Sequence, residues 1–293
     1  MHSSAYDIGK QFLERYCSAE NCRVLDVGSY DVNGSLRQCI GQNIDYVGAD
    51  LESGPGVDVV IDTPDVLPFE NGAFDAVIST STYEHAAHFW MLLLECARVT
   101  RPAGHIYINA PSNGAFHQFP FDYWRFYPDA GIAFAAWIRK NGYPISLIES
   151  GIAPQTLDQW NDFVAVLQKS DCPQWQGGFI TDADGFRNVR QHDKPGLLRH
   201  SAATEDQLQR AALERHLTGA RAELTRTHAE LTLLRPELAR MQAELAEARG
   251  NCALLRAKLD ARRRIFRRAA QKLAAAPFAV SRSIRDLASA VRR

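Results

Sequence analysis

The first two-thirds of the chain alternate between strand-like and helix-like patterns of apolar residues. Short apolar runs rich in β-branched residues predict seven strands, at 23–27, 44–49, 57–61, 74–79, 105–109, 145–149 and 163–167. Apolar residues at helical spacing predict a leading helix over 5–16 and another over 88–99, closed by the Arg-Pro-Ala-Gly stop at 101–104. Near-continuous apolar strands that alternate with helices indicate an α/β fold, with a mainly parallel sheet covered on both faces.

The pattern changes after residue 170. Residues 171–203 are rich in Gly, Asp, Pro and Gln without a sustained period, which predicts an irregular extension and linker. From 204 to 261, two apolar series each repeat every seven residues, with Thr227 the one polar member. The series are Leu217, Leu224, Leu231, Leu238, Leu245, Cys252 and Leu259, and Leu213, Ala220, Leu234, Met241, Ala248 and Leu255. This spacing predicts a long helical coiled coil that joins copies into a homo-oligomer.

Charged residues beside the two apolar series agree with a coiled coil. Glutamates precede the first series at 223, 230, 237 and 244, and arginines follow the second series at 221, 235, 249 and 256, so both can pair between chains. Pro236 lies on an outward position, where it is expected to kink or interrupt the helix. The alternative is a single long helix that folds back on the globular domain.

The net charge of −1 over 293 residues hides a basic tail. Residues 262–293 hold ten arginines and lysines against one aspartate, which gives +9 and leaves −10 for the rest. The tail is amphipathic, with apolar residues that include Val280, Ile284, Leu287 and Val291. Such a helix suits an anionic membrane surface. A docking segment for a partner protein is the alternative, and nucleic acid is disfavoured because aromatic residues are not interleaved with the arginines.

Cysteine usage and the absence of targeting patterns bear on the compartment. The six cysteines are scattered without metal-like spacing, which is typical of reduced thiols. The first residues lack the layout of a secretory signal, and no apolar stretch approaches the ~20 residues that cross a bilayer. These patterns predict a cytoplasmic protein, associated peripherally with the inner face of the cell membrane if the tail binds lipid.

The segment VLDVGSYDVNGSL, residues 24–36, carries the strongest local signal for chemistry. A strand, then glycines, then a helix places backbone amides at a helix N-terminus, where a polar or anionic cofactor can approach. Asp50 ends the next strand, where a carboxylate can accept hydrogen bonds from ribose hydroxyls. The segment does not read G-x-G-x-x-G, so a dinucleotide cofactor is disfavoured. The alternative for Asp26 and Asp50 is a role as turn or cap carboxylates.

The order of motifs along the chain indicates the cofactor. The chain reads LDVG, then YVGADL, then DTPDVLPFENGAFDAVISTSTYEH, then ARVTRPAGHIYINAPS. This order resembles that of class I S-adenosylmethionine-dependent methyltransferases of the methyltransferase type 11-like group. The loop HQFPFDYWRFYPDAG, residues 117–131, resembles loops in methyltransferases of polysaccharide and O-antigen biosynthesis. The resemblance covers about residues 20–170 and implies a Rossmann-like, seven-stranded methyltransferase sheet over 1–170, with S-adenosylmethionine as cofactor.

The resemblance also implies roles for individual residues. The loop beside the methionine part of the cofactor would contain Asp26, Gly28, Ser29 and Gly34. Asp50 would hold the ribose, and Leu51 would lie against the adenine. The adenine amino group would lie by Asp62 and Thr63, and the sulfonium would face Ser79 and Thr80. Two positions depart from the family pattern. Tyr30 stands where the middle glycine of the loop is expected, which leaves the loop geometry open, and Ala103 replaces a glycine of the usual R-P-G-G.

Two histidines are candidate general bases. His85 follows the fourth strand and His117 follows the fifth, at the sheet edge where active sites of open α/β folds form. A histidine near its natural pKa suits the removal of a hydroxyl proton. The alternative for each is structural packing, and for His85 shaping of the pocket. His88 and His105 are expected to be surface or capping residues.

The aromatic loop, residues 117–131, is a candidate acceptor site. Tyr123, Trp124, Arg125 and Tyr127 are the types of residue that hold a sugar ring, although the same residues suit a lid over the sheet edge. No Asp, Glu or His cluster with metal-ligand spacing is found, so no metal is predicted. Together these features predict an O-methyltransferase that acts on a sugar or glycan hydroxyl in cell-surface polysaccharide synthesis. The alternatives are a small-molecule methyltransferase oligomerised by its coiled coil and a non-catalytic scaffold with the methyltransferase fold.

Overall fold

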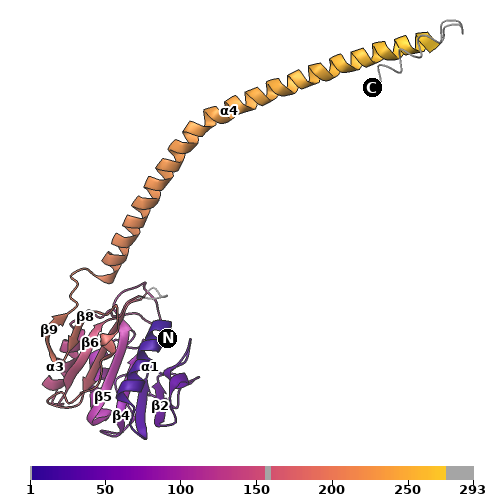
Figure 1. Ribbon diagram of the computed structural model, residues 1–293. Helices are drawn as coiled ribbons and strands as arrows, with labels where there is room; N and C mark the ends of the chain where they lie inside the picture. The colour runs from indigo at the N-terminus through magenta and orange to yellow at the C-terminus, as the bar shows by residue number, and fades with distance from the viewer. Residues whose placement is uncertain (1, 156–159, 275–293) are drawn as a thin grey trace. The chain divides into compact units, whose positions relative to one another are not determined.

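The computed structural model describes residues 2–155 and 160–274 and contains two compact units, Met1–Ala212 and Leu213–Arg293 (Figure 1). The first unit is a twisted sheet with helices packed on it, and the described residues of the second unit, 213–274, continue one long helix. The elements in chain order are α1 (Ser3–Tyr16), β1 (Cys22–Val27), the 3₁₀ turn η1 (Leu36–Cys39), β2 (Ile44–Asp50), β3 (Val59–Val60), β4 (Phe74–Thr80), α2 (Phe89–Val99), β5 (Thr100–Pro111), α3 (Ala130–Lys140), β6 (Ser146–Ile152), β7 (Asp162–Gln168), the 3₁₀ turn η2 (Ile180–Asp182), β8 (Arg187–Gln191), β9 (Lys194–Leu198) and α4 (Glu205–Ala274).

The sheet is larger and less parallel than the sequence predicted. Over the described residues it has nine strands in the order β3-β2-β1-β4-β5-β7-β6-β8-β9. The pairings among β3, β2, β1, β4 and β5 are parallel, whereas those from β5 through β7, β6 and β8 to β9 are antiparallel. The α/β methyltransferase-like sheet is therefore confirmed, but the predicted count of seven strands and the mainly parallel arrangement are wrong.

The difference in strand number arises in the stretch for which the sequence predicted irregular structure. In residues 171–203, β8 and β9 form an antiparallel hairpin that extends the sheet beyond β6. Val189 is fully buried there, and Asn188 and Gln191 are also buried, but each strand has only five residues. Such short, mostly polar strands carry no readable two-residue period, so their pairing depends on the exposed edge that β6 offers.

Alternation of side chains along the strands builds a separate core on each face of the sheet. In β4, Val77 contacts one core, whereas its neighbours Ala76 and Ile78 contact the other. The first core packs against α2 and α3, and the second against α1 and the segment around η2. Because neighbouring residues of a strand point to opposite faces, a strand covered on both sides must be apolar at nearly every position. This explains the near-continuous apolar runs in the sequence.

His105 is buried, contrary to the expectation of a surface or capping role. Its exposed fraction is 8%, and its ring packs edge-on against Tyr16 and Trp175, on the face of the sheet that α1 covers. The Nε2 atom has no hydrogen-bond partner in the described residues. Burial lowers the pKa of His105 from 6.5 to about 4, because the imidazolium loses its hydration there.

The lowered pKa of His105 predicts acid sensitivity of the fold. Since the unfolded chain binds a proton near pH 6.5 and the folded chain only near pH 4, stability is lost as the pH falls between these values. From pH 7 to pH 5 the expected loss from this residue is about 2 kcal/mol. In urea unfolding followed by tryptophan fluorescence, His105→Phe should lose about that much less stability than the wild type over this interval. Equal losses in the two proteins would contradict the prediction.

The helix α4 runs from Glu205 to Ala274 and continues through Pro236. No interruption occurs at this proline, which lies on an outward position of the heptad pattern. The helix is continuous across residue 261, where the coiled coil is predicted to end and the basic tail to begin, and this boundary stays a prediction. Val280, Ile284, Leu287 and Val291 lie outside the described residues. Among the helices that the structure describes, none has the length and apolar character to span a bilayer.

Candidate active site

The candidate site lies at the sheet edge where the parallel strands end. The chain passes from β1 outward to β2 and β3, and then returns to place β4 on the other side of β1. Ligands of open α/β sheets bind at such a reversal of strand order, beyond the carboxyl ends of the strands. The segments that follow β1, β2, β4 and β5 all lie at this edge of the sheet. The predicted cofactor residues lie at the ends of β1, β2 and β4 or in the loops after β1, β2 and β3, and the two candidate histidines follow β4 and β5.

The loop after β1 is held tightly against the segment after β4. Gly28 has a φ of +85°, and a Cβ at this position would lie 1.9 Å from Thr82 Oγ1. The carbonyl oxygen of Val27 accepts hydrogen bonds from Ser79 Oγ at 2.9 Å and from Thr82 Oγ1 at 3.3 Å. A residue with a side chain cannot occupy position 28 without displacing this contact, so Gly28 fixes how closely the two loops approach.

The expected helix after the glycine loop is absent from the described residues. Only the four-residue turn η1 follows, because Gly41 and Asn43 end the segment before β2 begins at Ile44. The backbone amides of Gly28 and Ser29 donate to the carbonyl oxygen of Ala49 at 2.9 and 3.2 Å. The predicted set of amides at a helix N-terminus is therefore wrong, and a cofactor at this edge must be held largely by side chains and by the remainder of the loop.

Asp50 organises the loop instead. Its Oδ2 accepts from the amide of Tyr30 at 3.0 Å, and its Oδ1 accepts from the amide of Leu51 at 2.7 Å. The ring of Tyr30 lies on Gly54, where a Cβ would approach it to 2.3 Å. Tyr30 therefore takes the place of the usual glycine by folding onto the loop after β2. A carboxylate has about four acceptor positions, so Asp50 keeps capacity for a ribose hydroxyl.

The other predicted cofactor residues fall into a buried group and an exposed group. Asp26 is buried and accepts from the hydroxyl of Tyr46, and burial raises its pKa to about 6. Leu51 is 50% exposed, as suits contact with a flat base, and Asp62 and Thr63 are exposed. Ser29, Ser79 and Thr80 belong to the buried group, and Gly34 is half-buried.

Polar atoms left without partners at this edge fit a polar cofactor. The hydroxyls of Ser29, Thr80 and Ser81 are buried and make no hydrogen bond within the part of the chain that the structure describes. Gly34 has a φ of +116° with open space beside it. Buried hydroxyls without partners are costly, and a ligand with hydroxyl, amino and carboxylate groups would satisfy them. The residues therefore fit a polar cofactor such as S-adenosylmethionine; the roles of Asp50 at the ribose and of Leu51 at the adenine stay predictions.

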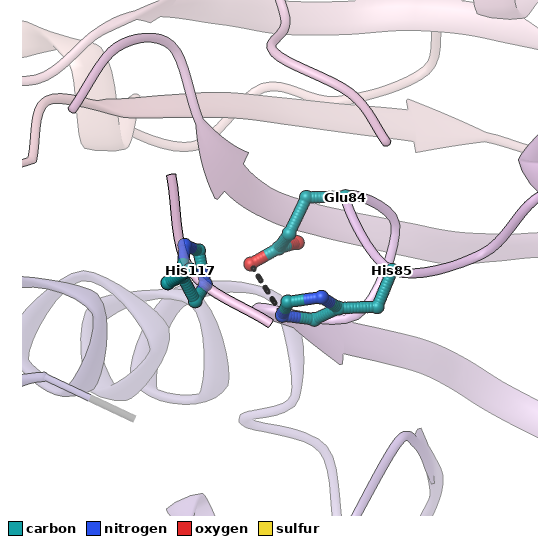
Figure 2. Close-up of side chains that lie close together, drawn as sticks. All are labelled: Glu84, His85 and His117. Atoms are coloured by element: carbon teal, nitrogen blue, oxygen red, sulfur yellow. Dashed lines mark ion pairs between the residues drawn. The ribbon is translucent and has the colours of Figure 1, made fainter. Parts of the chain in front are cut away.

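On the β4 and β5 side, the structure brings both candidate bases together with a glutamate (Figure 2). Glu84, His85 and His117 each offer one ligand atom within 4.8 Å of the others, and their side chains converge. His85 Nε2 lies 3.7 Å from Glu84 Oε1, and the two imidazole rings meet edge to face at 4.9 Å between centroids. Burial raises the pKa of Glu84 to about 8 and lowers the pKa of His85.

The two histidines are oriented by groups of the aromatic loop. His85 Nδ1 donates to the carbonyl oxygen of Phe121, since a carbonyl can only accept. His117 Nδ1 lies 3.4 Å from Asp122 Oδ2, and its ring lies against Trp160. Asp122 is held by a two-pronged ion pair with Arg125 at 2.5 and 2.8 Å, which lowers the pKa of Asp122 to about 2.

The four predicted acceptor residues divide by exposure. Trp124 packs on Phe89, and its Nε1 donates to the carbonyl oxygen of Ala86. Arg125 is engaged with Asp122 and with backbone carbonyls. These two residues form the frame of the loop. Tyr123 and Tyr127 are 46% and 65% exposed and remain available to a ligand.

Sequence reasoning missed Glu84 and Asp122. Glu84 is 1% exposed and follows the fully buried Tyr83, whereas Asp122 lies three residues before Arg125. The Tyr-Glu-His triplet and the Asp-x-x-Arg spacing were both readable. Neither pointed to His117, because residues 85 and 117 are adjacent only when β4 and β5 pair in the sheet. The structure thus assembles a set of ligand-type side chains that the spacing did not reveal.

Comparison with known proteins covers the part of the site that contains the predicted cofactor residues. Residues 13–108, from α1 into β5, match the family model described as a methyltransferase domain. The match ends before His117 and the aromatic loop. A search of curated proteins finds no match.

Solved structures that resemble the chain share little sequence with it. The 1,6-didemethyltoxoflavin-N1-methyltransferase of Burkholderia thailandensis, solved with S-adenosylhomocysteine, is 16% identical with a TM-score of 0.46, over 57% of this chain and 79% of that one. The cyclase SpnF is 13% identical with a TM-score of 0.43, over 56% and 81%. A SAM-dependent methyltransferase of Methanosarcina mazei is 14% identical with a TM-score of 0.40, over 52% and 94%. The match to a methyltransferase domain therefore rests on the family model, which covers residues 13–108.

Proposed function

We propose that the chain is an S-adenosylmethionine-dependent methyltransferase that methylates a hydroxyl of a sugar or glycan. One observation carries the acceptor side of the proposal: Glu84, His85 and His117 converge beside the candidate cofactor edge, under a loop that exposes aromatic rings. The match of residues 13–108 to a methyltransferase domain supports the cofactor.

The residues of the cluster supply what transfer to a hydroxyl needs. When bound, S-adenosylmethionine provides a methyl group on a positively charged sulfur, and attack by a hydroxyl oxygen requires that the hydroxyl proton leave. His85 is neutral at physiological pH, since burial lowers its pKa, and a neutral imidazole accepts a proton. Its Nδ1–H is held by the Phe121 carbonyl, so Nε2, which lies 3.7 Å from Glu84 Oε1, carries the lone pair that can accept the proton.

The aromatic loop supports a sugar as acceptor. Phe119 and Phe121 are 56% and 54% exposed, and Tyr123 lies 5.6 Å from Phe121 between ring centroids. Large exposed aromatic side chains grouped in one loop mark a binding surface, and their flat faces suit the C–H faces of a pyranose. Asp122 and Arg125 brace this loop from within, so the rings are presented on a fixed backbone.

The proposal is tested by binding and transfer measured on the same preparation. Calorimetry with S-adenosylhomocysteine should give a 1:1 complex, and transfer of unlabelled methyl groups to glycan acceptors should appear in mass spectrometry as a gain of about 14 Da per site, the mass of CH₂. Transfer to soluble metabolites alone would favour the small-molecule alternative. Failure to bind the cofactor at millimolar concentration would favour the non-catalytic scaffold.

We further propose that residues 204–261 pair with other copies of the chain. The leucines of both heptad series are more than half exposed in the single chain, among them Leu217, Leu224, Leu231, Leu238 and Leu245. A continuous apolar stripe of this kind on a charged helix is stable in water when it packs against a second helix. The basic residues of 262–293 would then be gathered in the oligomer, which strengthens their attraction to anionic lipid.

A seam substitution should separate the copies. Leu231→Lys places a charge at the centre of the apolar stripe, and is expected to shift the protein from oligomer to monomer in analytical ultracentrifugation at micromolar concentration. Leu233→Lys is the matched control, because Leu233 is 74% exposed and lies off both series. Equal sedimentation of the two variants would contradict the pairing.

Truncation after residue 261 should abolish flotation of the protein with anionic vesicles, and unchanged flotation would contradict the membrane role of the tail.

A further inference from the structure

The converging side chains of Glu84, His85 and His117 form a set of metal ligands. One carboxylate oxygen and one nitrogen from each imidazole lie within 4.8 Å of one another. In a tetrahedral site with bonds of ~2.0–2.1 Å, ligand atoms are about 3.3 Å apart, so small side-chain rotations close the set around an ion. Figure 2 shows Glu84 and the two rings directed toward a common point.

The groups behind the histidines are those that orient metal-bound imidazoles. A ligating histidine usually donates its second N–H to a backbone carbonyl or approaches a carboxylate. His85 Nδ1 donates to the Phe121 carbonyl, which leaves Nε2 with its lone pair toward Glu84. His117 lies beside the carboxylate of Asp122, and Arg125 holds that carboxylate in place.

Glu84 supplies an independent indication of a missing cationic partner. Its side chain is 1% exposed, and its Oε2 has no hydrogen-bond partner among the described residues. The backbone around it is fixed, since the Glu84 carbonyl oxygen accepts from the amides of Tyr123 and Trp124. Placing a carboxyl group in the interior with an oxygen unsatisfied is costly, and a bound cation would satisfy it.

We propose that Glu84, His85 and His117 bind one divalent transition-metal ion, with Zn²⁺ as the reference ion. Two imidazole nitrogens and one carboxylate are the donor set of catalytic zinc sites and of related sites for Fe²⁺, whereas Mg²⁺ and Ca²⁺ prefer sites made of oxygen. Three protein ligands leave a coordination position open, and His117 is partly exposed, so the open position faces solvent and an incoming acceptor.

The ion has a defined task if the protein transfers methyl groups, and this part rests on the proposed function. A hydroxyl bound to the ion loses its proton more readily, because the cation stabilises the alkoxide. The proton passes to solvent, the alkoxide oxygen forms the bond to the methyl carbon, and the carbon–sulfur bond breaks to leave neutral S-adenosylhomocysteine. With the ion bound, His85 and His117 would hold it, and the proton would pass to solvent; His85 Nε2 would accept the proton only in the metal-free arrangement.

Metal binding is tested on the full-length, untagged protein. After chelation and dialysis, titration with Zn²⁺ is expected to give one ion per chain with a dissociation constant below about 1 µM, and Co²⁺ is expected to give visible absorption typical of a low-symmetry site. His117→Ala should weaken Zn²⁺ binding at least 100-fold. Its ring is partly exposed, so the variant should fold, as unfolding followed by tryptophan fluorescence would show. His88→Ala is the control, because that side chain is 61% exposed and outside the cluster.

The outcomes separate the metal site from the proposed function. Zn²⁺ affinity that is equal in wild type and His117→Ala, or weaker than about 100 µM in the wild type, would overturn the site. If either of these results is found and S-adenosylhomocysteine still binds, the metal site fails and the methyltransferase proposal is kept. If Zn²⁺ binds through His117 while S-adenosylhomocysteine does not bind, the metal site stands and the proposed function fails.

Discussion

Replacement of Asp50 by alanine is expected to weaken S-adenosylhomocysteine binding about 100-fold. The carboxylate would accept hydrogen bonds from the ribose, and hydrogen bonds to a charged group contribute about 1.5–3 kcal/mol each. A loss of about 2.8 kcal/mol corresponds to a factor of 100 in the dissociation constant. The same carboxylate accepts from the Tyr30 and Leu51 amides, so its removal also loosens the loop that faces the cofactor.

A neighbouring carboxylate provides the control for this prediction. Glu52 is exposed and lies two residues after Asp50. Glu52→Ala removes the same charge and should change the affinity for S-adenosylhomocysteine less than threefold. Asp50→Asn keeps an acceptor oxygen and should fall between the two. Calorimetry on the three variants decides the matter, since affinities within threefold of the wild type for Asp50→Ala would exclude this residue from the cofactor site.

Replacement of Glu149 by alanine is expected to lower the free energy of unfolding by about 3–5 kcal/mol. The side chain is fully buried in β6, and its oxygens accept four hydrogen bonds. The donors are the Tyr16 hydroxyl at 2.6 Å, the amides of Ile180 and Thr181 at 3.0 and 2.8 Å, and the Thr181 hydroxyl at 2.7 Å. Alanine would leave all four donors buried without a partner, which is the costly case.

Urea unfolding followed by tryptophan fluorescence measures this effect directly. All five tryptophans lie in the first unit, and Trp175 stacks on Tyr16 at 4.1 Å between ring centroids, next to the lost hydrogen bond. Asp184→Ala is the control, because Asp184 is exposed beyond η2 and should change stability by less than about 0.5 kcal/mol. A loss below about 1 kcal/mol for Glu149→Ala would show that the network contributes little.

The apolar pattern was sufficient to locate the strands that lie inside the sheet. The strands at Phe74–Thr80 and Asp162–Gln168 were predicted within one residue at each end, because a strand buried on both faces is apolar at almost every position. The strand at Val59–Val60 was predicted too long, over 57–61, whereas Arg187–Gln191 and Lys194–Leu198 were missed. These last two strands are short and mostly polar, so their conformation is set by the neighbour that they pair with.

Part of the candidate site was also predictable from the sequence, and part was not. The position of Asp50 at the end of a strand was readable, as was the place of His85 and His117 after two strands, since these follow from local patterns. The helix expected after Gly34 did not form, and the loop amides turned to Ala49 and Asp50 instead. Such contacts depend on how the loops after β1 and β2 meet, and no local pattern encodes that.

The sequence by itself determined the α/β class, the methyltransferase-like order of motifs and the heptads of α4, because each depends on residues close together in the chain. Only the tertiary structure decided that Glu84, His85 and His117 converge, that Tyr30 folds onto Gly54, and that β8 and β9 extend the sheet. The physical reason is the register of the sheet. Pairing β4 with β5 brings together side chains that are 32 positions apart, and burial then determines which of their atoms lack a partner.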